Sequence, residues 1–218
     1  RAFYRRGCGG FGPKITQIPP PGPLVFKVCA MAAGAVRDSY FEAGLEILAE
    51  QGFGGLKLAE LCRRLGVTTG SFYHYFGGWS AYTADLIAYW RQDRTIRIID
   101  AIRTEADPRR RIETIIDVAL SLPHNAEAAI RAWSSVDPDV QRVQSEVDRE
   151  RFEILYASAQ EIVGEPRQAE VYAAWAVLVC VGYEQSTLPR ENPGFEWLSN
   201  RMLDDLAAGR IASAPPAP

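Results

Sequence analysis

Residues 57 to 76 read Lys-Leu-Ala-Glu-Leu-Cys-Arg-Arg-Leu-Gly-Val-Thr-Thr-Gly-Ser-Phe-Tyr-His-Tyr-Phe and predict two short helices joined by a tight turn. Apolar residues at helical spacing, from Leu58 to Leu65, indicate the first helix. Gly66 follows where a left-handed residue would end that helix, because glycine enters this conformation without a Cβ penalty. Thr68 is expected to cap the next helix. A helix, a glycine-containing turn and a second helix predict a helix-turn-helix.

The second helix of this pair has two different sides. At about 100° per residue, Phe72 and Phe76 share the side suited to packing against the first helix. No Asp or Glu occurs from residue 61 to 84, which favours a polyanion such as DNA as the partner of the other side. The alternative is a buried aromatic helix in an all-α core, where these residues only pack. The outward arc holds Gly70, Ser71, His74 and Tyr75.

The segment from Gly66 to Phe76 resembles the recognition-helix signature of the TetR family of bacterial transcriptional regulators (TetR/AcrR-like). That signature runs Gly-Val-Ser/Thr-x-Gly-x-Leu/Phe-Tyr-x-Tyr/His-Phe. Residues 40 to 53 resemble the family's first helix, and the match covers about residues 37 to 82. The resemblance implies an all-α fold, with an N-terminal three-helix helix-turn-helix domain and a C-terminal helical effector and dimerisation domain.

The resemblance also implies a set of DNA-binding residues, some at base edges and others at phosphates. Two of them depart from the family pattern. Lys57 stands where the family has a capping Ser or Thr, and it can meet a phosphate only as a point charge. Trp79 stands where the family favours a lysine, and it is expected to pack on the DNA backbone or on the neighbouring helix. The expected DNA-binding residues are Lys57, Thr68, Thr69, Gly70, Ser71, Tyr73, His74, Tyr75 and Trp79.

The full chain has 218 residues and a net charge of −3. Its N-terminal segment differs in composition from the rest. Residues 1–30 contain five basic and no acidic residues, together with five glycines and five prolines. We expect translation to begin at Met31 and the leader to be upstream sequence; a disordered basic arm that aids DNA binding is the alternative. The expected organisation is a disordered, non-native leader (1–34), a DNA-binding domain (35–82), an effector and dimerisation domain (83–210) and a disordered tail (211–218).

Beyond residue 80 the pattern is helical almost to the end. The helix expected at 167–186 is apolar nearly all round, which is typical of a helix buried on most sides. We expect it to face its own core and a second subunit, as the family's last two helices do; the centre of a monomer is the alternative. The other helices are expected at 80–106, 109–122, 125–133, 140–163 and 195–208. The residues expected at the dimer interface are Val171, Ala174, Val177, Leu178 and Val181.

Four aromatic residues lie on helices that should converge in the C-terminal domain. No basic cluster accompanies them, so they predict a pocket for a small hydrophobic effector. Their alternative role is to fill the core. A weaker resemblance to the effector domains of one TetR-like subgroup rests on Ile130 to Trp133, Asp137, Asp148 and Arg151. The expected pocket residues are Trp90, Trp133, Tyr172 and Trp175.

Other classes of protein find little support. The chain has two histidines, His74 and His124, and no HExxH, GxSxG, GxGxxG or P-loop motif, so we expect neither an enzyme nor a cofactor or metal site. The four cysteines lack CxxC spacing and are expected to be reduced thiols. No apolar run approaches the ~18 residues of a membrane span, and a cytoplasmic location is expected.

The function expected from these observations is that of a ligand-responsive transcriptional regulator. It would act as a homodimeric repressor on a palindromic operator in double-stranded DNA, and a small molecule would release it. The competing class is a helical ligand-binding or interaction protein that has lost sequence-specific DNA binding, which Lys57 and Trp79 make conceivable.

Overall fold

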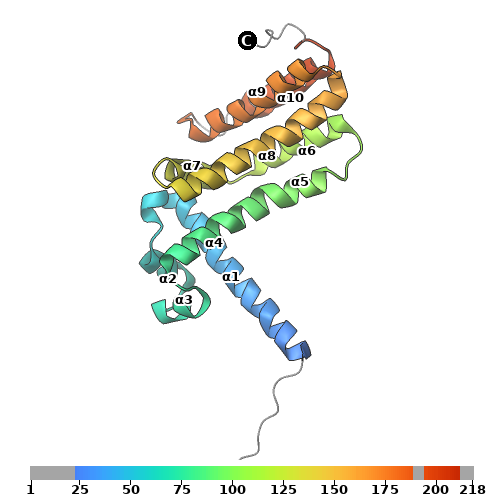
Figure 1. Ribbon diagram of the computed structural model, residues 1–218. Helices are drawn as coiled ribbons and strands as arrows, with labels where there is room; N and C mark the ends of the chain where they lie inside the picture. Colours follow the sequence, from blue (N-terminus) through green and yellow to red (C-terminus); the bar gives the residue numbers. More distant parts are fainter. Residues whose placement is uncertain (1–22, 189–193, 212–218) are drawn as a thin grey trace, which may run out of the picture. The chain divides into compact units, whose positions relative to one another are not determined.

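The computed structural model describes residues 23–188 and 194–211, with side chains from residue 34 onward. The chain divides into two units, residues 1–36 and 37–218, and all contacts described below lie within the second. Every element of the described residues is helical, which confirms the all-α fold (Figure 1). Most of the expected leader and the tail beyond Ile211 lie outside the described residues.

Short irregular turns separate most of the helices. Three of them begin with proline directly after an acidic residue that caps the helix. Asp107 accepts one hydrogen bond from a backbone N–H group of the first turn, and Asp137 and Glu165 accept two each. The helices are α1 (Pro23–Gln51), α2 (Leu58–Leu65), α3 (Thr69–Tyr75), α4 (Trp79–Arg91), α5 (Arg97–Ile102), α6 (Pro108–Ser121), α7 (His124–Ser134), α8 (Pro138–Val163), α9 (Pro166–Gln185) and α10 (Gly194–Ala207), with a short 3-10 turn at Phe53–Gly55.

Two expectations about helix boundaries are wrong. The helix α1 begins at Pro23, so residues 23–34 are helical rather than a disordered leader. The helix α4 begins at Trp79 and ends at Arg91, whereas one continuous helix was expected at 80–106. The expected domain boundary at residue 82 therefore falls inside α4.

A π-helical turn, Gln92–Ile96, connects α4 to α5. The chain thus runs from the first four helices into the C-terminal part as one interrupted helix, which Figure 1 shows in green. π-Helical turns inside α-helices are rare and often occur at functional sites. The amino-acid pattern of this segment predicts a continuous helix, so the turn is a structural finding.

The core around α1 to α4 is rich in aromatic rings. The Tyr82 hydroxyl donates a hydrogen bond to the Tyr40 carbonyl oxygen at 2.9 Å, joining α4 to α1. Gly44 makes this approach possible, because an added Cβ would lie 2.2 Å from the Tyr82 oxygen. Phe72 in α3 and Phe76 directly after it are buried in the same core, as predicted from the side of the helix that they share.

The C-terminal part packs α6, α8, α9 and α10 around a second apolar core (Figure 1). Aliphatic residues predominate, with Ile112, Leu203 and Leu206 almost fully buried. None of the described helices is long and apolar enough to cross a membrane.

Candidate DNA-binding surface and effector cavity

The helix-turn-helix has the local geometry that its sequence predicts. Gly66 is left-handed with φ 66°, and its backbone N–H bonds back to the end of α2. The Thr68 hydroxyl caps α3 by accepting a hydrogen bond from the Ser71 backbone N–H at 3.2 Å. Lys57 occupies the capping position of α2 and makes no side-chain cap bond there. These contacts position α3 relative to α2 through short-range interactions.

The expected DNA-binding residues fall into two groups in the structure. Seven are exposed or half-buried on the outside, and Tyr73 is 57% exposed. Tyr75 and Trp79 instead pack partly inward: Tyr75 lies against Tyr40, with ring centroids 5.8 Å apart, and Trp79 lies against Tyr82 at 5.1 Å. The outward group is Lys57, Thr68, Thr69, Gly70, Ser71, Tyr73 and His74.

Arg37 is a contributor to this surface that the sequence did not single out. Its Nη1 donates to the carbonyl oxygen of Tyr75, the last residue of α3, at 3.4 Å, and its guanidinium carbon lies 4.8 Å from the centre of the Phe76 ring. Its Nη2 also bonds to Asp85 at 2.6 Å. A cation at a helix C-terminus interacts favourably with the unpaired carbonyl groups there. Arg37 therefore holds the end of α3 between α1 and α4.

The two arginines of α2 are engaged in ion pairs. Arg63 pairs with Glu60 at 2.7 Å, and Arg64 pairs with Glu50 of α1 at 2.5 Å. The Arg63 guanidinium beside Glu60 holds the pKa of that carboxyl at about 2. These arginines tie α2 to its own first turn and to α1. Lys57 takes part in no ion pair among the described residues.

A cavity of about 110 Å³ opens in the C-terminal domain, and its walls are mainly aliphatic. Side chains of α5, α6, α8, α9 and α10 line it. Ile98, Ile102, Ile115 and Ile154 form much of the apolar wall. Its polar lining residues are Arg94, Thr95, Asp148, Arg151, Cys180 and Ser199.

Of the four aromatic residues expected in a pocket, the structure places only Tyr172 at this cavity. Trp90 is buried in the first core and Trp175 is 51% exposed on α9. Trp133 stacks on Phe53 with ring centroids 4.6 Å apart, and its Nε1 donates to Asp137 at 3.1 Å. The prediction that these four residues converge is wrong. Trp90 on α4 and Trp133 on α7 instead contact residues of other elements.

Trp90 and Trp133 instead connect the DNA-binding part to the C-terminal part. Trp90 Nε1 on α4 donates to Glu127 Oε1 on α7 at 2.7 Å. The stacked Phe53 ring belongs to the turn after α1, whereas Trp133 belongs to α7. Two aromatic residues assigned to ligand binding thus lie at a junction between domains.

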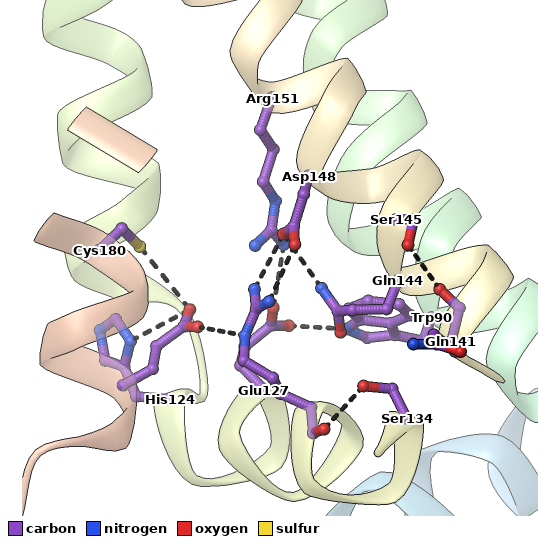
Figure 2. A network of polar contacts seen from close by, with 12 residues as sticks. Trp90, His124, Glu127, Ser134, Gln141, Gln144, Ser145, Asp148, Arg151 and Cys180 are labelled. Atoms are coloured by element: carbon purple, nitrogen blue, oxygen red, sulfur yellow. Dashed lines mark hydrogen bonds and ion pairs between the residues drawn. The ribbon is translucent and has the colours of Figure 1, made fainter. Parts of the chain in front are cut away.

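Buried charges surround this junction (Figure 2). Glu127, only 3% exposed, accepts a second hydrogen bond from Arg151 Nη2 at 2.9 Å. Arg131 and Asp148 form a two-pronged pair with both distances at 2.8 Å, and Gln144 donates to the same carboxylate at 3.1 Å. Because buried charges need partners, each carboxylate here lies beside an arginine.

Glu184 of α9 completes this group. It lies 4.0 Å from His124 and 3.9 Å from Arg131, and the Cys180 thiol donates to it at 3.7 Å. Burial and the negative charge of Glu127 raise the pKa of Glu184 to about 7. Among the described residues, no group of three His, Cys, Asp or Glu side chains is placed to hold a metal ion.

The outer side of α9 is apolar. Leu178 is 66% exposed and Trp175 is 51% exposed, one turn apart on that side. Val177 and Val181, expected at a dimer interface, line the cavity instead. Trp175 thus lies on the exposed side of α9 and Val177 on the side that lines the cavity; a helix that is apolar all round carries no periodic signal of which side faces inward. Val171 and Ala174 are half-buried.

The family model of the bacterial regulatory proteins of the tetR family matches residues 41–79. The HTH-type transcriptional regulator BetI of Rhizobium meliloti (strain 1021) is 26% identical over 125 residues, or 56% of this chain. The match spans 58% of the length of that curated relative.

Two solved structures share the fold. One is a transcriptional regulator from Rhodococcus sp. Rha1, with a TM-score of 0.64, 19% identity, and coverage of 84% of this chain and 99% of that one. The other is a putative transcriptional regulator from Saccharomonospora viridis in complex with choline, with a TM-score of 0.65, 14% identity, and coverage of 79% and 96%.

The Gly66 turn positions an exposed, capped α3 on α2, and the C-terminal helices surround an apolar cavity. These features define a helix-turn-helix protein of the DNA-binding class. Through residues 41–79 the chain is similar to the tetR family of bacterial regulatory proteins.

Proposed function

We propose that the chain is a ligand-responsive repressor that binds a palindromic operator as a homodimer. The observation that carries this proposal is the outer surface of α3. It presents Thr69, Gly70, Tyr73 and His74 to solvent and holds no acidic side chain, while Phe72 anchors the helix from behind. In helix-turn-helix dimers, two such helices enter successive major grooves about one helical turn apart.

Within this surface we assign different tasks to different residues. Thr69, Gly70 and Ser71 at the start of α3 would face base edges. Tyr73 and His74 would contact phosphates, and Lys57 would add a point charge at the start of α2. Tyr75 and Trp79 would act mainly by packing, since their rings lie against Tyr40 and Tyr82.

Dimerisation is assigned to α9 and α10. Four large apolar side chains are exposed on these two helices, which pack on each other, and exposed apolar surface can mark an interaction site. Two copies of the helix pair would bury these side chains in a four-helix bundle across a two-fold axis. The four are Trp175, Leu178, Trp197 and Leu198.

The effector would occupy the aliphatic cavity. The Saccharomonospora viridis regulator with the same fold holds choline, which supports a small-molecule effector for this chain too. Release from DNA requires that the effector bind more tightly to the arrangement of the dimer that does not fit the operator. The junction from Arg151 through Glu127 to Trp90 connects the cavity to α4.

Selection of genomic DNA fragments by the purified chain, followed by gel shift, tests the proposal. Tyr73→Ala and His74→Ala should weaken binding and reduce the salt dependence by ~0.9 per lost phosphate contact, and Ser71→Ala should alter preference at one base position in each half-site. Glu153→Ala, an exposed change on α8, serves as the matched control. If all three α3 variants fold and bind like wild type, α3 is not the reading helix.

Failure of the wild-type chain to select any fragment would support the competing class, a helical ligand-binding or interaction protein. The engagement of Arg63 and Arg64 in ion pairs favours that alternative, because these side chains are then less free to meet phosphates.

A further inference from the structure

The polar group that stands out in the aliphatic cavity is the hydroxyl of Thr95. Thr95 is 2% exposed and lines the cavity, and its Oγ1 has no hydrogen-bond partner within the described part of the chain. Threonine on a helix commonly returns its hydroxyl to a carbonyl oxygen one turn earlier. Thr95 lies on the π-helical turn Gln92–Ile96, so it departs from regular α-helical geometry at this point.

An unpaired hydroxyl in an aliphatic wall is unfavourable in the empty protein. Valine has nearly the same shape and would pack there without leaving a polar atom unsatisfied. A polar residue that is costly to stability and turned to a cavity is explained if a ligand supplies the missing partner.

The charged groups at the cavity already have partners. Asp148 is paired with Arg131, and Arg151 is paired with Glu127. Arg94 lies 3.4 Å from Asp93, although its Nε lacks a well-oriented hydrogen bond within the described residues. Burial raises the pKa of the Cys180 thiol to about 12, so this group is uncharged as well. A charged ligand would find its opposite charges already committed and would lose its hydration in an aliphatic cavity.

The volume sets the size of the ligand. A cavity of about 110 Å³ is somewhat smaller than the ~150 Å³ apolar cavity that holds benzene in an engineered protein. Because the cavity is partly open to solvent, a compact molecule of about six to nine non-hydrogen atoms can fill it and extend toward its mouth.

We propose that the effector cavity takes a small, uncharged, mostly aliphatic molecule whose single polar group is hydrogen-bonded by Thr95 Oγ1. The effector role of this molecule rests on the proposed function, whereas its binding to the cavity is independent of DNA. Because Thr95 belongs to the turn that joins α4 to α5, the bound oxygen or nitrogen would sit on the element that leads to the DNA-binding domain.

Calorimetric titration of the full chain with two matched pairs of probes tests the charge preference. Cyclohexanol and cyclohexylammonium differ in one polar group, as do cyclohexanecarboxamide and cyclohexanecarboxylate. Each neutral probe should bind at least about tenfold more tightly than its charged counterpart, because the ion pays for lost hydration without a free partner. Tighter binding of either ion, or no binding of any probe, would overturn the proposal.

Two variants test the role of Thr95 itself. Thr95→Val should weaken cyclohexanol binding about five- to tenfold, the effect of one lost hydrogen bond, while raising the melting temperature of the ligand-free protein. Thr95→Ser should retain most of the affinity because it keeps the hydroxyl. A lower melting temperature for Thr95→Val, or unchanged cyclohexanol affinity, would show that the hydroxyl has a partner inside the protein and would refute the assignment.

Gel shift with a selected operator fragment separates this inference from the proposed function. Binding of cyclohexanol that depends on Thr95 but leaves the DNA complex intact would uphold the ligand class and refute the effector role. Release of DNA by a charged probe that binds more tightly than its neutral counterpart would uphold the effector role and refute the ligand class.

Discussion

Trp90 Nε1 on α4 lies 2.7 Å from Glu127 Oε1 on α7, so one buried carboxylate receives a hydrogen bond from the DNA-binding part of the chain. The other oxygen of the same carboxylate receives Arg151, which lines the cavity. The two parts thus share a single anionic group at their junction. A displacement of Arg151 in the cavity wall would therefore change the contacts of Glu127, to which Trp90 is also bonded.

Removing either side of this contact should destabilise the protein by different amounts. Trp90→Phe keeps most of the packing and loses one hydrogen bond to a charged group, at a cost of about 1.5–3 kcal/mol. Glu127→Gln leaves Arg151 buried without its carboxylate and should cost about 3–5 kcal/mol. Denaturant unfolding measures both, and the exposed change Glu153→Gln should stay within about 0.5 kcal/mol of wild type. Equal, small effects of both variants would mean that the junction is hydrated and weak.

Arg37 should matter to DNA binding without touching DNA. Arg37→Ala removes the hydrogen bond to the Tyr75 carbonyl at the end of α3, so we expect a loss of about 1 kcal/mol in stability and weaker operator binding. Asp85→Asn removes only the ion pair of Arg37 and should change stability by about 0–1 kcal/mol with DNA affinity retained. Unfolding curves and gel shift together check this. An equal loss of DNA affinity in both variants would trace the effect to the ion pair instead.

Glu184 should make stability depend on pH. Its folded-state pKa of about 7 lies above its ordinary value of 4.5. Its contribution to the free energy of unfolding is therefore fully present below about pH 4.5 and is lost as the pH rises through 7. For a shift of this size the loss is about 3 kcal/mol.

The neutral variant Glu184→Gln isolates this contribution. Groups that titrate alike in wild type and variant do not contribute to the difference between their unfolding free energies. Between pH 4.5 and 8, wild type should therefore lose stability relative to the variant. A flat difference across this window would mean that Glu184 is ionised in the folded protein, held by Arg131 and Arg151.

The two sides of α9 should respond differently to charge. Leu178→Glu places a carboxylate on the exposed side, so we expect a folded chain that no longer dimerises. Val177→Glu places it in the cavity wall and should lower the melting temperature, since an unpaired buried charge is costly. Light scattering and thermal unfolding distinguish these outcomes. A Leu178→Glu chain that stays dimeric would place the interface elsewhere.

The features predicted correctly from the sequence are those set by neighbouring residues. The Gly66 turn and the cap of α3 by Thr68 depend on a few consecutive positions, and both are confirmed by the geometry. Arg131 and Asp148, two of the residues behind the weaker resemblance, meet in a partly buried ion pair, although their spacing alone did not predict this contact. Arg37 escaped notice because its partners are 38 and 48 residues away.

The aliphatic cavity shows more clearly what the sequence cannot predict. Its wall is built from aliphatic residues that ordinary core helices also contain, so no residue type marks it in the sequence. The prediction from aromatic residues selected Trp90 and Trp133, whose long side chains instead make contacts between domains. The direction in which Trp175 points depends on how α9 is rotated, and a helix apolar on every side offers no pattern from which to read that rotation.

The π-helical turn at Gln92–Ile96 is a position at which the chain can gain or lose a residue during evolution. Its hydrogen bonds close between residues five apart rather than four, so the turn holds one more residue than a regular α-helical turn. It is therefore a place where a single codon can be gained or lost inside a helix while the flanking segments keep their own hydrogen bonding. Relatives that lack this residue would carry α4 and α5 as one uninterrupted rod, with a different side chain where Thr95 now stands.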